Sequence, residues 1–367
     1  MRTDHTLTDT DTDSPICRRG GPTFVRRDRA PLGRLLPYRR AAGELPPPKA
    51  ALDAVHKNGW HLDLGARGLG DVLLGLALAQ ALHEATRDRY PQPAYVGPRA
   101  DLLARCTLPL TVTSANGHHS IGTESPTPRT FDAVPEVPPT RLDIVDANVL
   151  QVHAALPMRY YLDIEQSLGV RLPADSDPCP RFRATEPTPT PYHVLFVSTT
   201  SRPERKDYGI ENFAAIARCL TAHRPDAPWR FTLIATPDRA APPPAAQIEV
   251  FHGPTAVDCV DLFAAAELVL GNDTGLTHLA ALTDRPDGTG PTVVGLYGRH
   301  AHTKWITGSA RHHAVATPFS QLMSIADACP VRDGYDDTVW STASDLRAVP
   351  ADLIARFAGR CVGWWDS

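Results

Sequence analysis

The sequence lacks a long hydrophobic run, a cysteine pair and an excess of positive charge. Its longest apolar-rich stretch, residues 72–82, is too short and too interrupted to cross a bilayer as a helix. The seven cysteines are scattered without a C-x-x-C pair, which argues against a disulfide framework or a zinc site and favours a reducing compartment. The net charge of −4 provides no basic field that would attract nucleic acid. We therefore expect a cytoplasmic protein that has no transmembrane segment and binds no nucleic acid.

Residues 1–58 also contain few hydrophobic residues, and no apolar core marks a secretory signal there. Residues 1–13 are rich in Thr and Asp, residues 18–40 are rich in Arg, and three prolines follow at 46–48. Low hydrophobicity with mixed charge predicts a disordered N-terminal extension. Contact of the Arg-rich part with an acidic partner is the alternative.

The remainder contains two successive alternations of strand and helix patterns, and 367 residues are enough for two domains. A Pro-rich stretch at 173–191 separates them. We predict one domain at 59–185, a second at 186–345, and a C-terminal helix at 346–367 that could cross back to the first domain.

The alternation predicts the α/β class with parallel, doubly wound sheets, in which ligands bind beyond the carboxyl ends of the strands. The clearest expected strands are residues 60–64, 193–197, 231–235, 267–270 and 291–297, with further ones at 94–96, 108–113 and 142–145. The expected helices are residues 72–82, 160–168, 211–220 and 257–266.

The most informative stretch is residues 269–281, an apolar strand, a polar turn and a helical pattern. Asp273 and Thr274 stand where a helix N-cap is expected, and the N–H groups of Gly275 and the two residues after it would point out of the helix end. Such an end attracts anions, because unpaired donors and the helix dipole act together. The turn therefore suits a ligand with phosphate and sugar hydroxyls. An ordinary capped strand–turn–helix is the alternative.

A second loop, residues 65–71, also lies between an expected strand and a helix. Its glycines do not follow G-x-G-x-x-G, and Asp71-Val72 stands where a P-loop needs Lys followed by Ser or Thr. We therefore expect the loop to place the Asp71 carboxylate at the start of a helix, facing a crevice. The alternative is that Asp71 only caps this helix.

A third polar loop, residues 198–208, follows the strand at 193–197. All three loops follow strands, so they are expected to face a cleft between the domains. The histidine pairs at 118–119 and 312–313 lack the spacing of metal ligands with a third partner, and we predict that both lie on the surface.

Three motifs resemble glycosyltransferase family 9, the heptosyltransferases. Residues 68–73, GLGDVL, are similar to the family's L-G-D-V-L motif, and residues 272–279, NDTGLTHL, resemble its D-[ST]-G-x-x-H-L motif. Residues 199–213 are similar to its T-x-x-x-x-K-x-W-P-x-E-x-[FW] segment. The resemblance implies the GT-B fold, in which two facing Rossmann-like domains with parallel sheets enclose an interdomain cleft. It also implies sugar transfer from a nucleotide-diphosphate sugar, with inversion at the anomeric carbon.

The resemblance further implies roles for individual residues, with the first domain binding the acceptor and the second the donor. Asp71 is implied as the general base, and Asp273 as the partner of donor-sugar hydroxyls. His278 either belongs to the donor site or packs and braces the loop. The remaining implied residues are Gly68 and Gly70 in the acceptor loop, Thr274, Gly275 and Leu276 at the phosphates, and Thr199, Thr200 and Lys206 around the diphosphate. A cation, hydroxyls and a helix N-terminus can stabilise the leaving diphosphate, so no metal and no cofactor besides the donor is expected. Without the resemblance, Lys206 reads as a solvated loop lysine.

Two departures from the family pattern are expected to border the donor site. The loop at 283–290 is longer and more polar than the family's connection, and residues 298–300, Gly-Arg-His, replace its G-P-[ST]. Four nearby residues form either an altered nucleotide pocket or a surface loop: Arg299, His300, Lys304 and Trp305.

The expected partners are a nucleotide-sugar donor and a hydroxyl-bearing acceptor. The acceptor is either a natural product, such as an aminoglycoside-type antibiotic, or a cell-surface glycan. No amphipathic basic helix is visible, and peripheral membrane contact stays open. One alternative function is a non-catalytic nucleotide-sugar-binding or assembly protein of the same fold. A nicotinamide-dependent oxidoreductase is another, although the G-x-G-x-x-G pattern that it needs is missing.

Overall fold

The computed structural model describes the chain in segments, and the account below concerns these segments alone. They are residues 23–25, 61–63, 68–86, 94–96, 99–109, 111–112, 155–159, 178–185, 189–236, 247–326 and 337–365. The expected strand at 142–145, the expected helix at 160–168 and the histidines at 118–119 lie outside the described residues.

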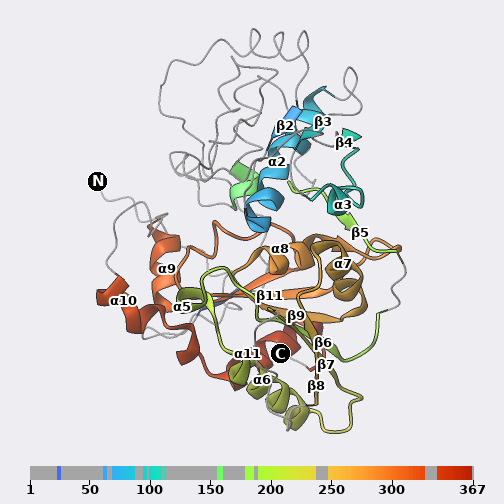
Figure 1. The fold of residues 1–367 in the computed structure, drawn as a ribbon. Coiled ribbons are helices and arrows are strands. Elements are labelled where there is room, and N and C mark those ends of the chain that lie inside the picture. The colour runs from blue at the N-terminus through green and yellow to red at the C-terminus, as the bar shows by residue number, and fades with distance from the viewer. Residues whose placement is uncertain are drawn as a thin grey trace, which may run out of the picture.

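The larger sheet has seven strands in the order β1-β12-β11-β9-β6-β7-β8 (Figure 1). Every neighbouring pair is parallel except β1 with β12, which confirms the predicted α/β class. The strands are β1 (Thr23–Val25), β6 (His193–Val197), β7 (Arg230–Ala235), β8 (Ile248–His252), β9 (Leu268–Asn272), β11 (Thr292–Tyr297) and β12 (His312–Ala316).

Strand β1 comes from the extension predicted to be disordered. Its Thr23 pairs with Ala316 and its Val25 with Ala314, in antiparallel register on the edge strand β12. For these three residues the prediction of disorder is wrong. The open edge of β12 supplies backbone partners, and composition alone does not reveal them.

Helices cover both faces of the larger sheet (Figure 1). On one face lie α7 (Ala256–Ala265) and α8 (Gly275–Leu282), and on the other lie α6 (Ile210–His223) and α11 (Ala351–Val362). Strand β6 shows why this is stable. Leu195 and Val197 pack into the core beneath α7 and α8, whereas Phe196 packs into the core beneath α6 and α11. A strand that is apolar on both faces must be covered on both.

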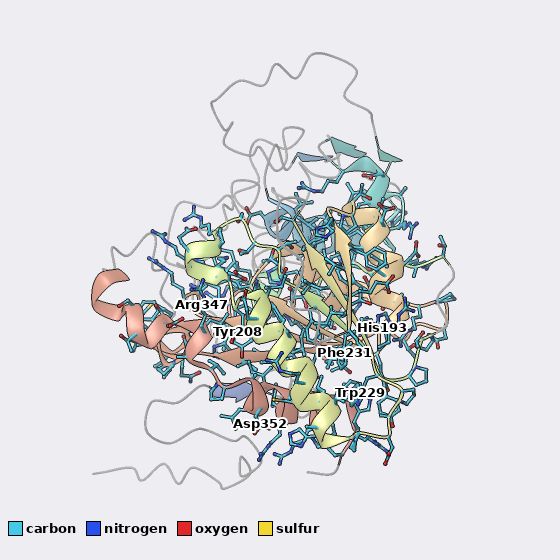
Figure 2. All side chains as sticks on the ribbon, turned by 60° about the horizontal axis from the view of Figure 1, so that its bottom comes forward. His193, Tyr208, Trp229, Phe231, Arg347 and Asp352 are labelled. Carbon is cyan, nitrogen blue, oxygen red and sulfur yellow. The ribbon has the colours of Figure 1, made fainter. Side chains whose placement is uncertain are left out.

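The C-terminal segment is held on the α6 face of the larger sheet (Figure 2). His223 of α6 lies 2.9 Å from Asp352 of α11, measured from Nε2 to Oδ1. Trp229 stacks on Phe231 with ring centroids 5.8 Å apart and meets Trp364 edge-on at 4.9 Å. Within the predicted helix at 346–367, α11 thus packs on α6, β9 and β11.

A smaller parallel sheet has the order β2-β3-β4, and helices alternate with its strands along the chain. Its elements are β2 (His61–Asp63), α2 (Leu69–Thr86), β3 (Ala94–Val96), α3 (Ala100–Leu103) and β4 (Thr111–Val112). Helix α2 packs against α8, and residues of both helices belong to one apolar core. The domain boundaries at 59–185 and 186–345 stay a prediction. None of the described helices is both long and apolar enough to span a membrane.

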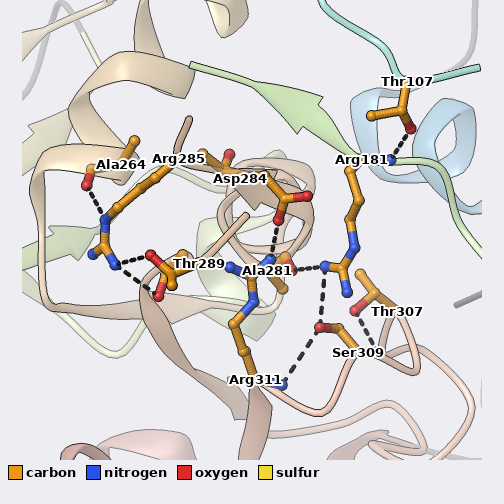
Figure 3. A network of polar contacts seen from close by, with 12 residues as sticks. Thr107, Arg181, Ala264, Ala281, Asp284, Arg285, Thr289, Thr307, Ser309 and Arg311 are labelled. Carbon is orange, nitrogen blue, oxygen red and sulfur yellow. Dashed lines mark hydrogen bonds and ion pairs between the residues drawn. The ribbon is translucent and has the colours of Figure 1, made fainter. Parts of the chain in front are cut away.

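A network of arginines fixes the short parallel pair β5 (Phe182–Arg183) and β10 (Thr283–Asp284) at the carboxyl end of α8 (Figure 3). Arg181 Nη1 donates to the Ala281 carbonyl at 2.8 Å, and Arg285 Nε donates to the Ala264 carbonyl at 2.8 Å. The segment at 283–290 therefore lies at the end of α8 opposite its N-terminus. An eight-residue helix separates the two ends by about 12 Å. Whether the segment at 283–290 borders the donor site stays a prediction.

Candidate functional site

The turn between β9 and α8 has the strand–turn–helix geometry expected from the sequence. Thr274 takes the N-cap position of α8 and its carbonyl accepts from His278 N at 3.2 Å. Its side chain makes no capping hydrogen bond, contrary to the expected hydroxyl cap. The first N–H groups of α8 thus lack a side-chain cap and keep the character of an anion site.

Asp273 is the centre of a buried cluster of charges. Its side chain is 7% exposed, and its Oδ2 lies 2.8 Å from Lys206 Nζ and 3.0 Å from His300 Nδ1. Lys206 Nζ also donates to the Asp273 carbonyl at 3.4 Å. Burial by itself would raise the pKa of Asp273, but Lys206 and the two neighbouring histidines outweigh it and hold the pKa far below its ordinary value. Asp273 is therefore a permanent carboxylate at neutral pH.

His278 lies beneath this carboxylate, on the first turn of α8. Its Nε2 is 4.0 Å from Asp273 Oδ1, and its buried Nδ1 has no hydrogen-bond partner. Burial lowers the pKa of His278 to about 4, with Lys206 adding to the effect and Asp273 opposing it. His278 is thus neutral at pH 7. Whether it belongs to the donor site or only braces the turn stays a prediction.

Lys206 comes to Asp273 from α5 (Pro203–Lys206), in the polar loop after β6. Its side chain is 19% exposed and is held by the Asp273 carboxylate, so its reading as a solvated loop lysine is wrong. Thr199 and Thr200 are half-buried at the start of the same loop. Sequence and structure agree that this loop and the β9–α8 turn share one edge of the sheet.

Asn272 ties the two loops together, a role that sequence reasoning missed. Its Nδ2 donates to the Ser198 carbonyl at 3.2 Å and to Asp207 Oδ1 at 3.0 Å, and its Oδ1 accepts from Tyr208 N at 3.0 Å. The signal was available: a polar residue ending a buried strand must find hydrogen-bond partners.

The first turn of α2 lies directly against the first turn of α8. A Cβ added to Gly275 would lie 2.5 Å from Gly70 N and 2.7 Å from Leu69 Cβ, so only glycine permits this approach. A Cβ on Gly70 would lie 3.3 Å from the His278 ring. Two segments about 200 residues apart in sequence therefore meet at their glycines.

Asp71 is the third residue of α2 and is half-buried. The cap position belongs to Gly68, whose carbonyl accepts from Val72 N at 3.1 Å. The alternative in which Asp71 serves as the N-cap is therefore wrong. Its Oδ2 would lie 3.7 Å from a Cβ added to Gly68, so the carboxylate stays near the start of α2.

The segment after β11 is buried rather than a surface loop. Arg299 is 7% exposed and Lys304 is fully buried, while His300 reaches Asp273. Arg299 also lines an adjacent pocket of about 600 Å³, together with Asp207, α5 residues and residues 341–348. The surface-loop alternative is thus wrong for these residues. Whether the segment contacts a nucleotide stays a prediction.

His312 and His313 are buried in β12, so the prediction that they lie on the surface is wrong. Thr307 Oγ1 lies 3.1 Å from His312 Nδ1, and the Tyr297 hydroxyl lies 3.3 Å from its Nε2. These partners make burial of a polar ring acceptable. Among the residues that the structure describes, no group of three or more His, Cys, Asp or Glu side chains is arranged to hold a metal ion.

Residues 144–332, more than half of the chain, match the family model of glycosyltransferase family 9 (heptosyltransferase). A family 9 glycosyltransferase from Veillonella parvula shares 14% identity, with 84% of this chain and 100% of that chain covered at a TM-score of 0.49. The E. coli heptosyltransferase WaaC with ADP shares 16% identity, with 80% of this chain and 97% of that chain covered at a TM-score of 0.48. The E. coli ADP-heptose lps heptosyltransferase II shares 14% identity, with 82% of this chain and 97% of that chain covered at a TM-score of 0.47. No curated protein matches the chain.

Proposed function

Because the chain belongs to glycosyltransferase family 9, we propose that it is an inverting enzyme that moves a sugar from a nucleotide-diphosphate sugar to an acceptor hydroxyl. The observation that carries this proposal is the contact between α2 and α8 at Gly70 and Gly275. Asp71 is carried by the same first turn of α2, so we expect its carboxylate to lie beside the uncapped N-terminus of α8. A base for one substrate and an anion site for the other would then share one location.

The donor diphosphate would bind at α8. Its N-terminal N–H groups at Gly275 and Leu276 lack a side-chain cap, and the helix dipole favours negative charge there. Lys206 supplies a positive charge at the same turn, with the Thr199 and Thr200 hydroxyls in the neighbouring loop. These groups would stabilise the charge that grows on the diphosphate as it leaves.

In the proposed step, the acceptor oxygen attacks the anomeric carbon while the bond from that carbon to the diphosphate oxygen breaks. The proton of the acceptor hydroxyl passes to the Asp71 carboxylate. Attack from the side opposite the leaving group inverts the configuration. Asp273 would accept hydrogen bonds from donor-sugar hydroxyls, because it stays ionised in its buried cluster. A general base of this kind contributes about 10²–10⁴-fold to the rate.

We propose the cytoplasm as the site of action, and either a natural product, such as an aminoglycoside-type antibiotic, or a cell-surface glycan as the acceptor. The competing function is a non-catalytic nucleotide-sugar-binding or assembly protein of the same fold. The two functions differ in turnover. An enzyme should release nucleoside diphosphate from ADP-heptose or another nucleotide sugar, and a binder should only show a raised melting temperature with that ligand.

The decisive experiment is Asp71→Asn, which keeps the size of the side chain and removes the base. Turnover should fall by about 10²-fold or more, whereas affinity for nucleoside diphosphate should persist, because α8 and Lys206 are intact. Asp101 is the matched control, since it is an exposed acid in the first turn of α3. Asp101→Asn should retain full activity. A folded Asp71→Asn protein with near-normal turnover would remove Asp71 from the mechanism.

A further inference from the structure

His300 and Lys206 share one oxygen of Asp273. His300 Nδ1 lies 3.0 Å from Oδ2, and Lys206 Nζ lies 2.8 Å from the same atom. The other oxygen, Oδ1, has His278 Nε2 at 4.0 Å, which is beyond a hydrogen bond. The carboxylate is therefore anchored through one oxygen, and its second oxygen keeps acceptor capacity.

The contact with Asp273 also fixes which nitrogen of His300 carries the proton. Burial lowers the pKa of His300, with Lys206 and Arg299 acting in the same direction against the opposing effect of Asp273. The ring is thus neutral at pH 7 and has one N–H group. Since Asp273 is ionised and can only accept, that N–H must be at Nδ1, which leaves Nε2 with a lone pair.

Nε2 of His300 is the remaining polar atom of this side chain. The His300 side chain is 15% exposed, and within the described part of the chain no group hydrogen-bonds Nε2. The Trp305 ring, with its centroid 6.0 Å from that of His300, packs beside the imidazole and limits its rotation. His300 Nε2 is thus a second hydrogen-bond acceptor without a described partner, on the side chain beside Asp273.

We propose that His300 is a specificity-determining residue for the donor sugar: it orients Asp273 through Nδ1–H and accepts a hydrogen bond from a sugar hydroxyl at Nε2. Two acceptors on neighbouring side chains fit a ligand that presents two hydroxyl donors, as a sugar does. They disfavour a further phosphate, which presents only acceptors at neutral pH. The inference rests on the proposed function, and it assigns the sugar rather than the diphosphate to this residue.

The tautomer can be tested without any ligand. The protein is labelled with ¹⁵N-histidine, and the His300 signals are identified by their loss in His300→Asn. At pH 7 the wild-type ring should show a protonated Nδ1 and a bare Nε2, and Asp273→Ala, which removes the acceptor, should abolish this preference. A His300 ring that is protonated at Nε2, or at both nitrogens, at pH 7 would overturn the inference.

The binding role is tested by calorimetry with ADP and with ADP-heptose as probes. His300→Leu removes both hydrogen bonds and should weaken ADP-heptose about tenfold or more while changing ADP less than about twofold. His300→Asn keeps a donor for Asp273 but lacks the Nε2 acceptor, so its affinity for ADP-heptose should lie between those of wild type and Leu. The control His302→Asn alters an imidazole two residues away that bonds Ser324, and it should leave the ratio of the two affinities unchanged.

Equal weakening of ADP and ADP-heptose in His300→Leu would show a structural role only and would overturn the inference. Unchanged binding of both would do the same. Failure of the proposed function looks different. A protein that only binds nucleotide sugars would show these affinities without turnover, and a protein with an unrelated function would bind neither these probes nor other nucleotide sugars. The tautomer measurement still decides the arrangement at Asp273 in that case.

Discussion

At its amino end, helix α8 meets a carboxylate surrounded by cationic and imidazole groups, whereas at its carboxyl end it meets guanidinium groups that donate to carbonyls. Asp273 lies at the first end, with Lys206 and His300 on one oxygen. Arg181 and Arg285 lie at the second, where they bond the terminal carbonyls of α8 and α7 (Figure 3). Both ends place a charge of the sign that the helix dipole favours.

The two ends differ in how completely their polar groups are used. Arg285 donates from all three of its nitrogens, to Ala264, Ala266, Thr289 and Gly290. At the other end, no described residue places a donor within hydrogen-bond distance of Asp273 Oδ1 or a partner on His278 Nδ1. Buried polar groups whose hydrogen bonds are all made within the protein stabilise the fold. Buried polar groups that lack a hydrogen bond can form one with a ligand. The amino end of α8 is thus suited to binding and the carboxyl end to stability.

Arg285→Met should produce the largest change, a loss of about 3 kcal/mol in the free energy of unfolding. It leaves buried carbonyls without donors, and each such group costs about 1–3 kcal/mol. Denaturant unfolding measures this, and turnover of the folded fraction should be unchanged. Arg230→Met, which removes an exposed pair with Glu249, is the matched control and should change stability by less than about 0.5 kcal/mol. Equal stability of the two variants would contradict the comparison.

Lys206→Met is the corresponding change at the amino end. Loss of a charged contact with the diphosphate should cost about 1.5–3 kcal/mol of donor binding, seen as a raised KM for the donor and slower turnover. Steady-state kinetics on a nucleotide sugar measures this. Unchanged donor kinetics would mean that Lys206 serves only to neutralise Asp273.

Acid should lower the free energy of unfolding through His278, at the amino end of α8. The pKa of this ring is about 4 in the folded protein against an ordinary 6.5, so between these values the unfolded chain binds the extra proton. The contribution of His278 to the free energy of unfolding should therefore be complete above pH 6.5. It should fall by about 1.4 kcal/mol per pH unit as pH drops toward 4, a total loss near 2 kcal/mol by pH 5. Unfolding in urea at pH 7.5, 6.0 and 5.0 measures the slope. His278→Asn should flatten it, and an unchanged slope would exclude His278 as its source.

Removal of residues 1–50 should produce the smallest change. The deletion takes away β1, a three-residue edge strand on β12, and this should cost on the order of 1 kcal/mol. Both ends of α8 remain, so activity should persist. The measurement is the melting temperature and turnover of a chain that begins at Ala51. Loss of soluble expression would show that the extension contributes more than β1.

Much of the fold follows from local pattern. The apolar run at 193–197 forms β6, and the break in pattern at Asp273 and Thr274 falls between β9 and α8. Strand β12 was missed, because its two histidines look polar. His312 is buried beside Thr307 and Tyr297, which supply its hydrogen-bond partners. Short strands that depend on such partners carry no periodic signal of their own.

The candidate site was predicted in parts. The residue types at Asp71, Lys206 and Asp273 could be named from their motifs, and the structure brings Lys206 and Asp273 into contact. The place of His300 remained open between a pocket and a surface loop. Its contact with Asp273 spans 27 residues and crosses from one strand end to the next, so no local spacing encodes it.

The sequence by itself determined the strand–turn–helix units and the glycines at their turns, because periodicity and backbone freedom act over a few residues. Only the tertiary structure decided that Gly70 meets Gly275 and that Lys206 and His300 meet on one oxygen of Asp273. The reason is physical. Parallel strands are joined by crossovers, so side chains far apart in the chain become neighbours at the strand ends only once the sheet has formed.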